Sequence, residues 1–154
     1  MKKTAIIIVN WNGLRHLQKC FDALEKQTYK DFDVFLIDNG SKDESIEFTK
    51  KNFENIKIIE LDTNTGFAKG NNIGFEHAKK HNNYDYYVCL NNDTEVHDNW
   101  LEELISKADE DELNGIVTSK IIFGDKITIQ STGMVDSNDL GFMHVGMGTN
   151  KEEF

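Results

Sequence analysis

The chain has 154 residues, of which 38% are hydrophobic and 29% are charged, and it contains no proline. A chain of this length can bury about 70% of the surface that its unfolded form exposes, so it can hold one globular core without disulfides or a structural metal; disordered and fibrous classes are excluded. The 27 acidic and 17 basic residues give a formal net charge of −10, which disfavours binding to nucleic acid or to anionic lipid.

Both cysteines, Cys20 and Cys89, lie within apolar patterns and belong to no Cys-x-x-Cys motif. This pattern is typical of small buried thiols in a reducing compartment, so we expect a cytoplasmic protein. The apolar run at residues 5–9 follows a basic start and is similar to part of a signal peptide. It is too short, however, for export or for spanning a bilayer.

Short apolar runs alternate with amphipathic stretches along the first 123 residues. The runs predict strands at residues 5–9, 33–37, 56–61, 86–90 and 116–123. The stretches between them predict helices that begin near Asn12, at Ser41 of a Ser-x-x-Glu capping box, at Asn71 or Asn72, and at Asp98. This order is typical of an α/β fold with a doubly wound, mainly parallel, Rossmann-like sheet and helices on both faces, in which ligands bind at the carboxyl ends of the strands.

The pattern changes after residue 123. Gly124 and Asp125 separate two β-rich runs and predict a hairpin with a two-residue turn. Glycines then interrupt the chain from residue 133 onward, and no helix or strand period is long enough to predict an element. We therefore expect an α/β domain at residues 1–123, followed at residues 124–154 by a hairpin and a glycine-rich extension.

Polar residues follow the predicted strands. The first loop, residues 10–13, matches neither glycine-rich phosphate motif, which argues against NAD-type and P-loop sites. The second strand ends in Asp38 and Asn39, and an acid at this place can accept hydrogen bonds from a ribose hydroxyl or a base N–H. Alternatively, these two side chains form only an Asx turn before Ser41.

The strand at residues 86–90 is followed by Asn91, Asn92 and Asp93. A carboxylate flanked by amide oxygens offers hard ligands to Mg²⁺ or Mn²⁺, and a metal held by so few ligands takes others from substrate phosphates. Such a cation would also offset the repulsion between a phosphorylated ligand and this acidic chain. The alternative is an ordinary polar turn.

The segment at residues 64–74 holds two closely spaced glycines, Gly66 and Gly70, around Lys69. Glycines allow close backbone approach, Lys69 can reach a phosphate, and Asn71 or Asn72 can cap a helix while presenting an amide to a ligand. The alternative is a loop with a solvated lysine.

Taken together, four ordered segments resemble the family 2 glycosyltransferases with a GT-A fold, and especially their rhamnosyltransferase-like branch. The segments are residues 8–12, 37–43, 64–74 and 90–94. The resemblance covers most of residues 4–123, and residues 130–148 are similar to the glycine-rich stretch that follows in this family. It implies inverting, metal-assisted transfer of a sugar from a UDP- or dTDP-linked donor to a glycan or lipid-linked acceptor.

The resemblance also assigns roles to residues. Asp38 would contact the base or ribose, and Asp93 would meet the divalent metal on the diphosphate at the place of the family's Asp-x-Asp motif, where Asn91 replaces the first acid. The residues that the resemblance places in donor binding are Asn10, Asn12, Asp38, Asn39, Lys69, Asn71, Asn72, Asn91 and Asn92.

The resemblance assigns no catalytic residue within the chain. Family members carry a general base in a downstream segment, which we expect beyond Phe154, so the chain resembles the donor-binding half of a longer enzyme. The resemblance then implies that residues 124–154 begin the missing acceptor-binding part. That parent would meet a lipid-linked acceptor at the inner membrane face, although no membrane segment is found in the chain. The alternative function is a non-catalytic module that binds a nucleotide sugar or a partner chain.

Overall fold

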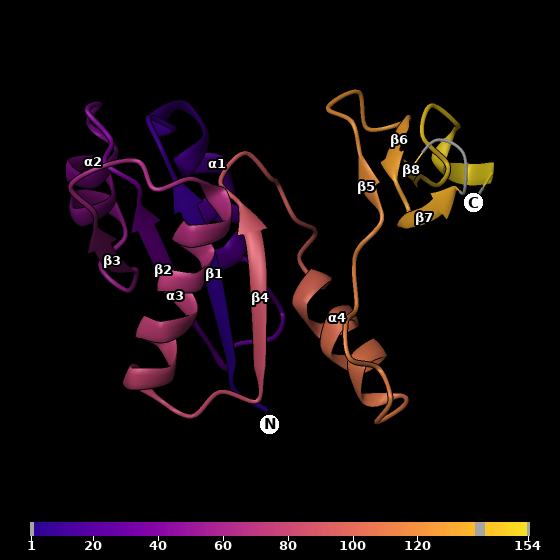
Figure 1. Cartoon of the computed structure of the whole chain (residues 1–154), viewed down its shortest axis with the longest axis horizontal. Helices are drawn as coiled ribbons and strands as arrows, with labels where there is room; N and C mark the ends of the chain where they lie inside the picture. The colour runs from indigo at the N-terminus through magenta and orange to yellow at the C-terminus, as the bar shows by residue number, and fades with distance from the viewer. Residues whose placement is uncertain (1, 138–140, 154) are drawn as a thin grey trace. The chain divides into compact units, whose positions relative to one another are not determined.

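A computed structural model describes residues 2–137 and 141–153. The chain divides into two compact units, Met1–Glu102 and Glu103–Phe154, and each is described here by itself (Figure 1). Our predicted boundary between residues 123 and 124 is of a different kind, because it marks where the donor-binding part ends rather than where one compact unit ends. That boundary stays a prediction. Within the described residues, no helix combines the length and apolar character needed to cross a lipid bilayer.

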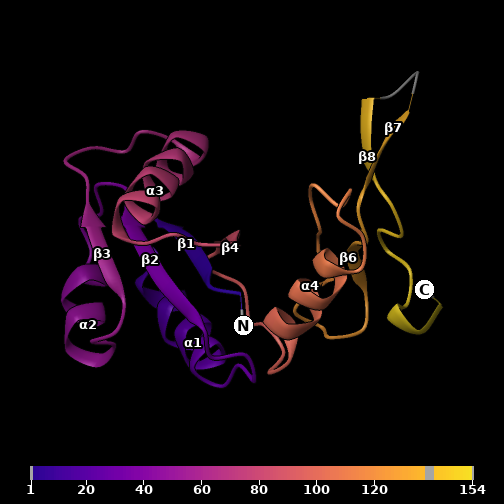
Figure 2. The same cartoon turned by 90° about the horizontal axis from the view of Figure 1, so that it is seen from below.

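The first unit contains a parallel sheet of four strands in the order β3-β2-β1-β4. The strands are β1 (Thr4–Asn10), β2 (Phe32–Asp38), β3 (Lys57–Glu60) and β4 (Tyr86–Asn91). Helix α3 (Phe67–His81) covers one face, and α1 (Leu14–Glu25) and α2 (Ser45–Asn52) cover the other (Figure 2). This arrangement confirms the predicted α/β fold with helices on both faces of a parallel sheet.

The core of this unit forms around β1. Residues 5–8 are fully buried, so both faces of the strand are covered, as its unbroken apolar run predicts. Helix α3 packs closely on one face at Gly74, where an added Cβ would lie 2.3 Å from Cγ2 of Ile7. Beneath the other face, the Phe21 and Phe53 rings meet edge to face, with centroids 5.0 Å apart. Full burial of an isoleucine stabilises the fold by about 1.5–3 kcal/mol, so β1 firmly anchors the polar residues at its carboxyl end.

Helix α2 begins at Ser45, so the predicted start at Ser41 is wrong. The Oγ of Ser41 accepts a hydrogen bond from the backbone N–H of Asn12 at 2.9 Å and makes no capping hydrogen bond to α2. Asp43 serves the helix starts instead. Its Oδ1 accepts the N–H of Ser45 at 3.2 Å, and its Oδ2 accepts the N–H of Leu14, at the start of α1, at 3.1 Å.

Two further helix starts also differ from the prediction. Helix α3 begins at Phe67, and Asn71 donates to the backbone C=O of Phe67 at 3.0 Å rather than capping the helix. Helix α4 (Trp100–Asp109) begins after the predicted Asp98 cap, and the Oε1 of Gln27 accepts the N–H of Leu101 at 2.9 Å. A tertiary partner, Gln27, therefore takes the place of a local cap at the start of α4, whereas α3 starts after Gly66 without a side-chain cap.

The two cysteines differ in burial. Cys20 is buried as predicted; burial and, second, the negative charge of Asp93 raise its pKa to about 12. Cys89 is exposed, so its predicted burial is wrong. The reason is that β4 forms an edge of the four-stranded sheet, where Tyr87 and Cys89 point to an exposed side.

The second unit contains two short antiparallel pairs. They join β5 (Ile121–Ile122) to β6 (Ile129–Ser131) and β7 (Met134–Ser137) to β8 (Gly141–His144), and a 3-10 turn follows at Lys151–Glu153. The predicted strand at residues 116–123 is thus reduced to two residues outside the parallel sheet. Ile116 is 93% exposed, because a β-prone run forms a strand only where a neighbouring strand pairs with it.

The predicted hairpin at Gly124 and Asp125 is confirmed as an antiparallel pair, but its two-residue turn is wrong. The connection runs over residues 123–128, with Lys126 in the left-handed region at φ 64°. The Oδ1 of Asp125 accepts the backbone N–H groups of Ile127 and Thr128, both at 2.9 Å. This Asx turn stabilises the longer connection.

Candidate functional site

The carboxyl ends of β1, β2 and β4 meet at one edge of the sheet, where their arrowheads point in Figure 1. The register sets Asn10 beside Asp38 and Val9 beside Asn91. A pocket of about 420 Å³ lies at this edge. It is lined by Val9, Phe67, Asn91, Asn92 and Asp93. Three residues predicted from the sequence to bind donor or metal therefore line one pocket.

Asp93 supplies the carboxylate of this pocket. Its side chain is exposed, and Asn91 and Asn92 add amide groups beside it. Among the described residues no group of three or more His, Cys, Asp or Glu side chains could hold a metal by itself. One carboxylate with amide oxygens fits a hard divalent cation that takes its other ligands from phosphate and water.

Asp38 lies at the end of β2 and is almost fully buried. Its Oδ1 accepts a hydrogen bond from Nδ2 of Asn10 at 3.1 Å, and its Oδ2 accepts the backbone N–H of Ser41 at 2.9 Å. The second bond is the local turn that the sequence suggests as an alternative role. A carboxylate has about four lone-pair sites, so the turn does not exhaust the capacity of Asp38 to accept hydrogen bonds.

Asn12 ties the loop after β1 to the loop after β2. Its backbone N–H donates to Oγ of Ser41, and its Oδ1 accepts the N–H of Lys42 at 2.7 Å. Asn12 is in the left-handed region at φ 51°, which asparagine tolerates better than most residues. These bonds give Asn12 a structural role in the loop. The predicted contact of Asn12 with a nucleotide-sugar donor stays a prediction.

Asn39 is buried and faces the loop before α3. Its Nδ2 donates to Oδ1 of Asn64 at 3.0 Å and to the C=O of Gly66 at 3.2 Å. Its Oδ1 accepts the N–H of Thr65 at 2.8 Å. These three bonds hold the loop that leads into α3, and the predicted direct contact of Asn39 with a donor stays a prediction.

The other predicted residues of this segment lie on α3. Lys69 and Asn72 are exposed, whereas Asn71 is buried and donates to the helix backbone. None of the three lines the pocket; Phe67 does. Sequence reasoning missed Phe67 because it placed the helix start four residues later. The available sequence signal was a glycine directly before this large apolar residue, because glycine tolerates a positive φ such as the 85° that Gly66 adopts before α3.

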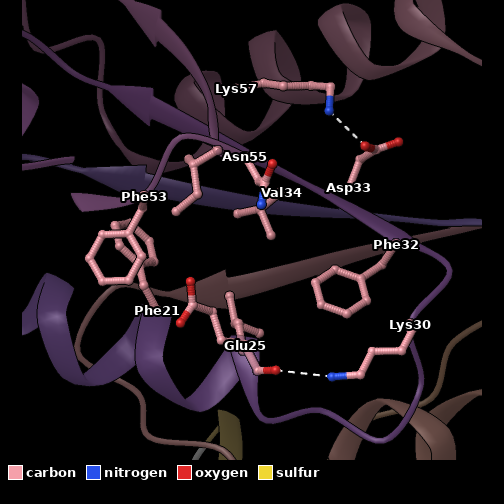
Figure 3. Close-up of a pocket in the computed structure, with 11 residues that line it drawn as sticks. Phe21, Glu25, Lys30, Phe32, Asp33, Val34, Phe53, Asn55 and Lys57 are labelled. Carbon is pink, nitrogen blue, oxygen red and sulfur yellow. Dashed lines mark hydrogen bonds and ion pairs between the residues drawn. The ribbon is translucent and has the colours of Figure 1, made fainter. Parts of the chain in front are cut away.

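A larger pocket lies at the opposite, amino edge of the sheet, with a volume of about 550 Å³ (Figure 3). Phe21, Val34 and Phe53 form part of its apolar lining. Three of its charged groups bond within the protein: Lys57 pairs with Asp33 at 2.6 Å, and Lys30 donates to the backbone C=O of Glu25 at 3.0 Å. None of the predicted donor or metal residues lies there, so the smaller pocket is the functional candidate.

Comparison with known proteins agrees with this fold. A model of the family described as Glycosyl transferase family 2 matches residues 5–144. The teichoic acid poly(glycerol phosphate) polymerase of Staphylococcus epidermidis is 30% identical over 62% of this chain and 13% of its own length. Glycosyltransferase AglE of Haloferax volcanii is 29% identical over 66% of this chain and 34% of its own length. The chain therefore spans about a third or less of these two relatives.

Solved structures show the same fold. S. aureus TarS 1-349 in complex with UDP-GlcNAc has a TM-score of 0.63 and 21% identity, over 79% of this chain and 38% of that one. The mannosyltransferase PcManGT of Pyrobaculum calidifontis, in complex with GDP-Man and Mn²⁺, has a TM-score of 0.50 and 16% identity, over 60% of this chain and 28% of that one. The resemblance to a GT-A fold is thereby confirmed, whereas its rhamnosyltransferase-like branch stays a prediction. On the family match over most of its length, the chain belongs to glycosyl transferase family 2.

Proposed function

We propose that this chain binds the nucleoside-diphosphate sugar donor of a glycosyltransferase that transfers the sugar, with inversion and metal assistance, to a glycan or lipid-linked acceptor. The observation that carries the proposal is that the Asp38 network and the Asp93 pocket gather at one edge of the sheet in a member of this family. Doubly wound sheets bind nucleotides at this edge.

The Asp38 end of the site is suited to a nucleoside. Asn10 and the N–H of Ser41 hold the carboxylate of Asp38 in one orientation, and the carboxylate then accepts a hydrogen bond from a base N–H or a ribose hydroxyl. Trp11 stands next to Asn10 in the chain, and its indole is 57% exposed. Such a ring offers a stacking surface to a base.

The Asp93 end is suited to a diphosphate. Asp93 and Asn91 would hold Mg²⁺ or Mn²⁺, which when bound supplies Lewis-acid neutralisation of the leaving diphosphate. The formal net charge of −10 repels a free diphosphate, so binding should depend on the cation. Lys69 on the exposed side of α3 adds one positive charge near the start of the helix.

The ligand class is supported by solved proteins of the same fold. Their complexes contain UDP, UDP-GlcNAc and GDP-Man. We take a UDP- or dTDP-linked sugar as the donor of this chain and keep GDP as a test ligand. A cytoplasmic protein working at the inner membrane face would have both this donor and a lipid-linked acceptor within reach.

The decisive experiment titrates UDP, dTDP and GDP into the protein with and without Mn²⁺ by calorimetry. We expect Mn²⁺ to raise the affinity for one diphosphate by at least about tenfold, equivalent to ~1.4 kcal/mol. Asp93→Ala should remove this gain. The matched control is Glu54→Ala, which removes one negative charge from an exposed residue between α2 and β3. A diphosphate affinity that changes neither on addition of Mn²⁺ nor in Asp93→Ala would contradict the metal assignment.

Turnover separates an enzyme from a binding module. Because the chain spans only part of its relatives, transfer and binding must be measured separately. Release of nucleoside diphosphate from the bound donor, with a sugar acceptor present, would support catalysis by this chain. Binding without release would support the non-catalytic module as the function of these 154 residues.

A further inference from the structure

We propose that Asn92, Asn10 and Asp38 form a side-chain relay that sets the spacing between the metal end and the nucleoside end of the donor site. In this proposal, which rests on the proposed function, Asn10 and Asn92 are positioning residues that act through Asp38 and Asp93. The relay joins residues at the ends of three neighbouring strands, β2, β1 and β4.

The relay consists of short hydrogen bonds around one buried amide. Asn10 is fully buried at the end of β1. Its Nδ2 donates to Oδ1 of Asp38 at 3.1 Å and to Oγ of Ser41 at 3.2 Å, and its Oδ1 accepts from Nδ2 of Asn92 at 2.7 Å. Every polar atom of the Asn10 side chain therefore has a protein partner. This leaves Asn10 to link its neighbours rather than to contact a donor.

The chemistry of the partners gives the Asn10 amide one orientation. The Asp38 carboxylate is an acceptor only, so it requires the NH₂ end of Asn10. The opposite end is then the carbonyl oxygen, which requires a donor, and Nδ2 of Asn92 supplies it. In a buried site with a low local dielectric, a reversed amide would leave unmatched groups at both ends. The relay thus transmits the position of Asp38 to Asn92.

Gly13 is an independent sign that the relay is built into the fold. A Cβ added at Gly13 would lie 2.2 Å from Nδ2 of Asn92 and 2.4 Å from Oδ1 of Asn10, the two atoms of their shared hydrogen bond. The backbone of Gly13 is at φ −104°, which any residue can adopt. A side chain at position 13 would therefore have to displace the amide pair, although the backbone conformation itself would allow it.

The functional consequence follows from chain continuity. Asn92 directly precedes Asp93, so a shift of Asn92 moves the metal-binding carboxylate relative to Asp38. A nucleoside diphosphate must reach both ends at once, so a changed spacing weakens its contact with one end, and loss of a contact to a charged group can lower affinity by about 10- to 100-fold. A nucleoside monophosphate lacks the second phosphate and should depend less on this spacing.

The test compares Asn92→Ala and Gly13→Ala with the wild-type protein, using UDP and UMP as probes with and without Mn²⁺. Asn83→Ala is the matched control, because Asn83 is an exposed asparagine in the loop before β4, at the opposite edge. We expect both relay variants to lose at least about tenfold of the Mn²⁺-dependent gain in UDP affinity, with less than about twofold change in UMP affinity without Mn²⁺. Asn92 is only partly buried, so Asn92→Ala remains informative if Gly13→Ala does not fold.

Two results would overturn the relay. Equal weakening of UMP and UDP binding would identify a merely structural role, and unchanged UDP affinity in both variants would show that the two ends are independent.

A measurement without nucleotide separates failure of the relay from failure of the proposed function. If the wild-type protein shows no Mn²⁺-dependent UDP binding, the proposed function fails, and ¹H–¹⁵N spectra alone then decide on the relay. Asn92→Ala should shift the side-chain amide signals of Asn10, and Gly13→Ala should shift those of Asn10 and Asn92. Asn10 signals that stay unchanged in both variants would contradict the relay.

Discussion

Carboxylates at the two edges of the central sheet differ in whether a positive charge of the protein compensates them. At the amino edge, the Asp33 carboxylate is held by Lys57 at 2.6 Å, by Lys3 at 3.2 Å and by the Tyr84 hydroxyl at 2.7 Å. At the carboxyl edge, Asp38 is held by a neutral amide and a backbone N–H, and Asp93 makes no ion pair within the described part of the chain.

Under the proposed function, charge compensation indicates the candidate site better than cavity size does. The larger pocket lies at the amino edge, where the Asp33 carboxylate already pairs with Lys57. The smaller pocket lies at the carboxyl edge, where a carboxylate remains available to an external cation. Substitutions at the carboxyl edge should therefore change ligand affinity. Substitutions at the amino edge should instead change the free energy of unfolding.

The largest difference between the edges should appear when each carboxylate is removed. Asp38→Ala should lower the affinity for the bound nucleoside diphosphate by about 10- to 100-fold, because a hydrogen bond to a charged group contributes about 1.5–3 kcal/mol. Asp33→Ala should leave the affinity nearly unchanged, since Asp33 lies at the opposite edge of the sheet. Calorimetric titration of both variants checks this, and equal losses would remove the distinction between the edges.

The second test measures how much the hydrogen bonds between Asn39 and the loop before α3 contribute to stability. Asn39→Ala should lower the free energy of unfolding by about 1–3 kcal/mol, because it removes a buried amide that bonds to the N–H of Thr65 and to the C=O of Gly66. Urea denaturation measures the change.

Asn52→Ala is the control for this test. The exposed Asn52 amide donates to the backbone C=O of Phe48, at the end of α2. Its removal should cost less than about 0.5 kcal/mol, as is usual for surface substitutions. A similar cost for both variants would mean that Asn39 does not hold the loop before α3.

Local patterns were sufficient to predict the four strands of the parallel sheet and the edge at which their carboxyl ends meet, but the fifth predicted strand, at residues 116–123, lies outside this sheet. The apolar run at residues 5–9 predicts a strand covered on both faces, and its first four residues are fully buried. The carboxyl ends of parallel strands meet at one edge, so Asn91, Asn92 and Asp93 could be expected near β1 before any coordinates were known.

The partners of individual polar side chains could not be predicted in the same way. Asn10 bonds to Asp38 and Asn92, which are 28 and 82 positions away. Ser41 has the local sequence of a helix cap, but its Oγ accepts a hydrogen bond from the N–H of Asn12, 29 positions away. Short-range rules describe which groups need a hydrogen bond, whereas the folded structure decides which of several partners is in reach.

A smaller effect is expected from Trp11, whose exposed indole follows Asn10. Trp11→Ala should weaken nucleotide binding by about two- to tenfold, because aromatic stacking contributes about 0.5–1.5 kcal/mol, and Trp11→Phe should recover part of the loss. The chain has one other tryptophan, Trp100, so a Trp100→Phe background isolates the emission of Trp11. Nucleotide should then quench this emission; unaltered emission and affinity would exclude stacking on Trp11.

The smallest expected effect concerns the amino edge and acid pH. Burial acts to raise the pKa of Asp33, but hydrogen bonds from Lys57, Tyr84 and Lys3 lower it from 3.8 to about 2. A carboxyl with a lower pKa in the folded state stabilises the fold above its unfolded pKa, and this contribution disappears as the pH falls from about 4 to about 2. The loss should be about 1 kcal/mol or less, since the ion pairs are partly exposed. Urea denaturation from pH 5 to pH 2 should show this loss in the wild-type protein and less of it in Asp33→Asn. Equal pH dependence in both proteins would mean that charge at the amino edge is not what stabilises it.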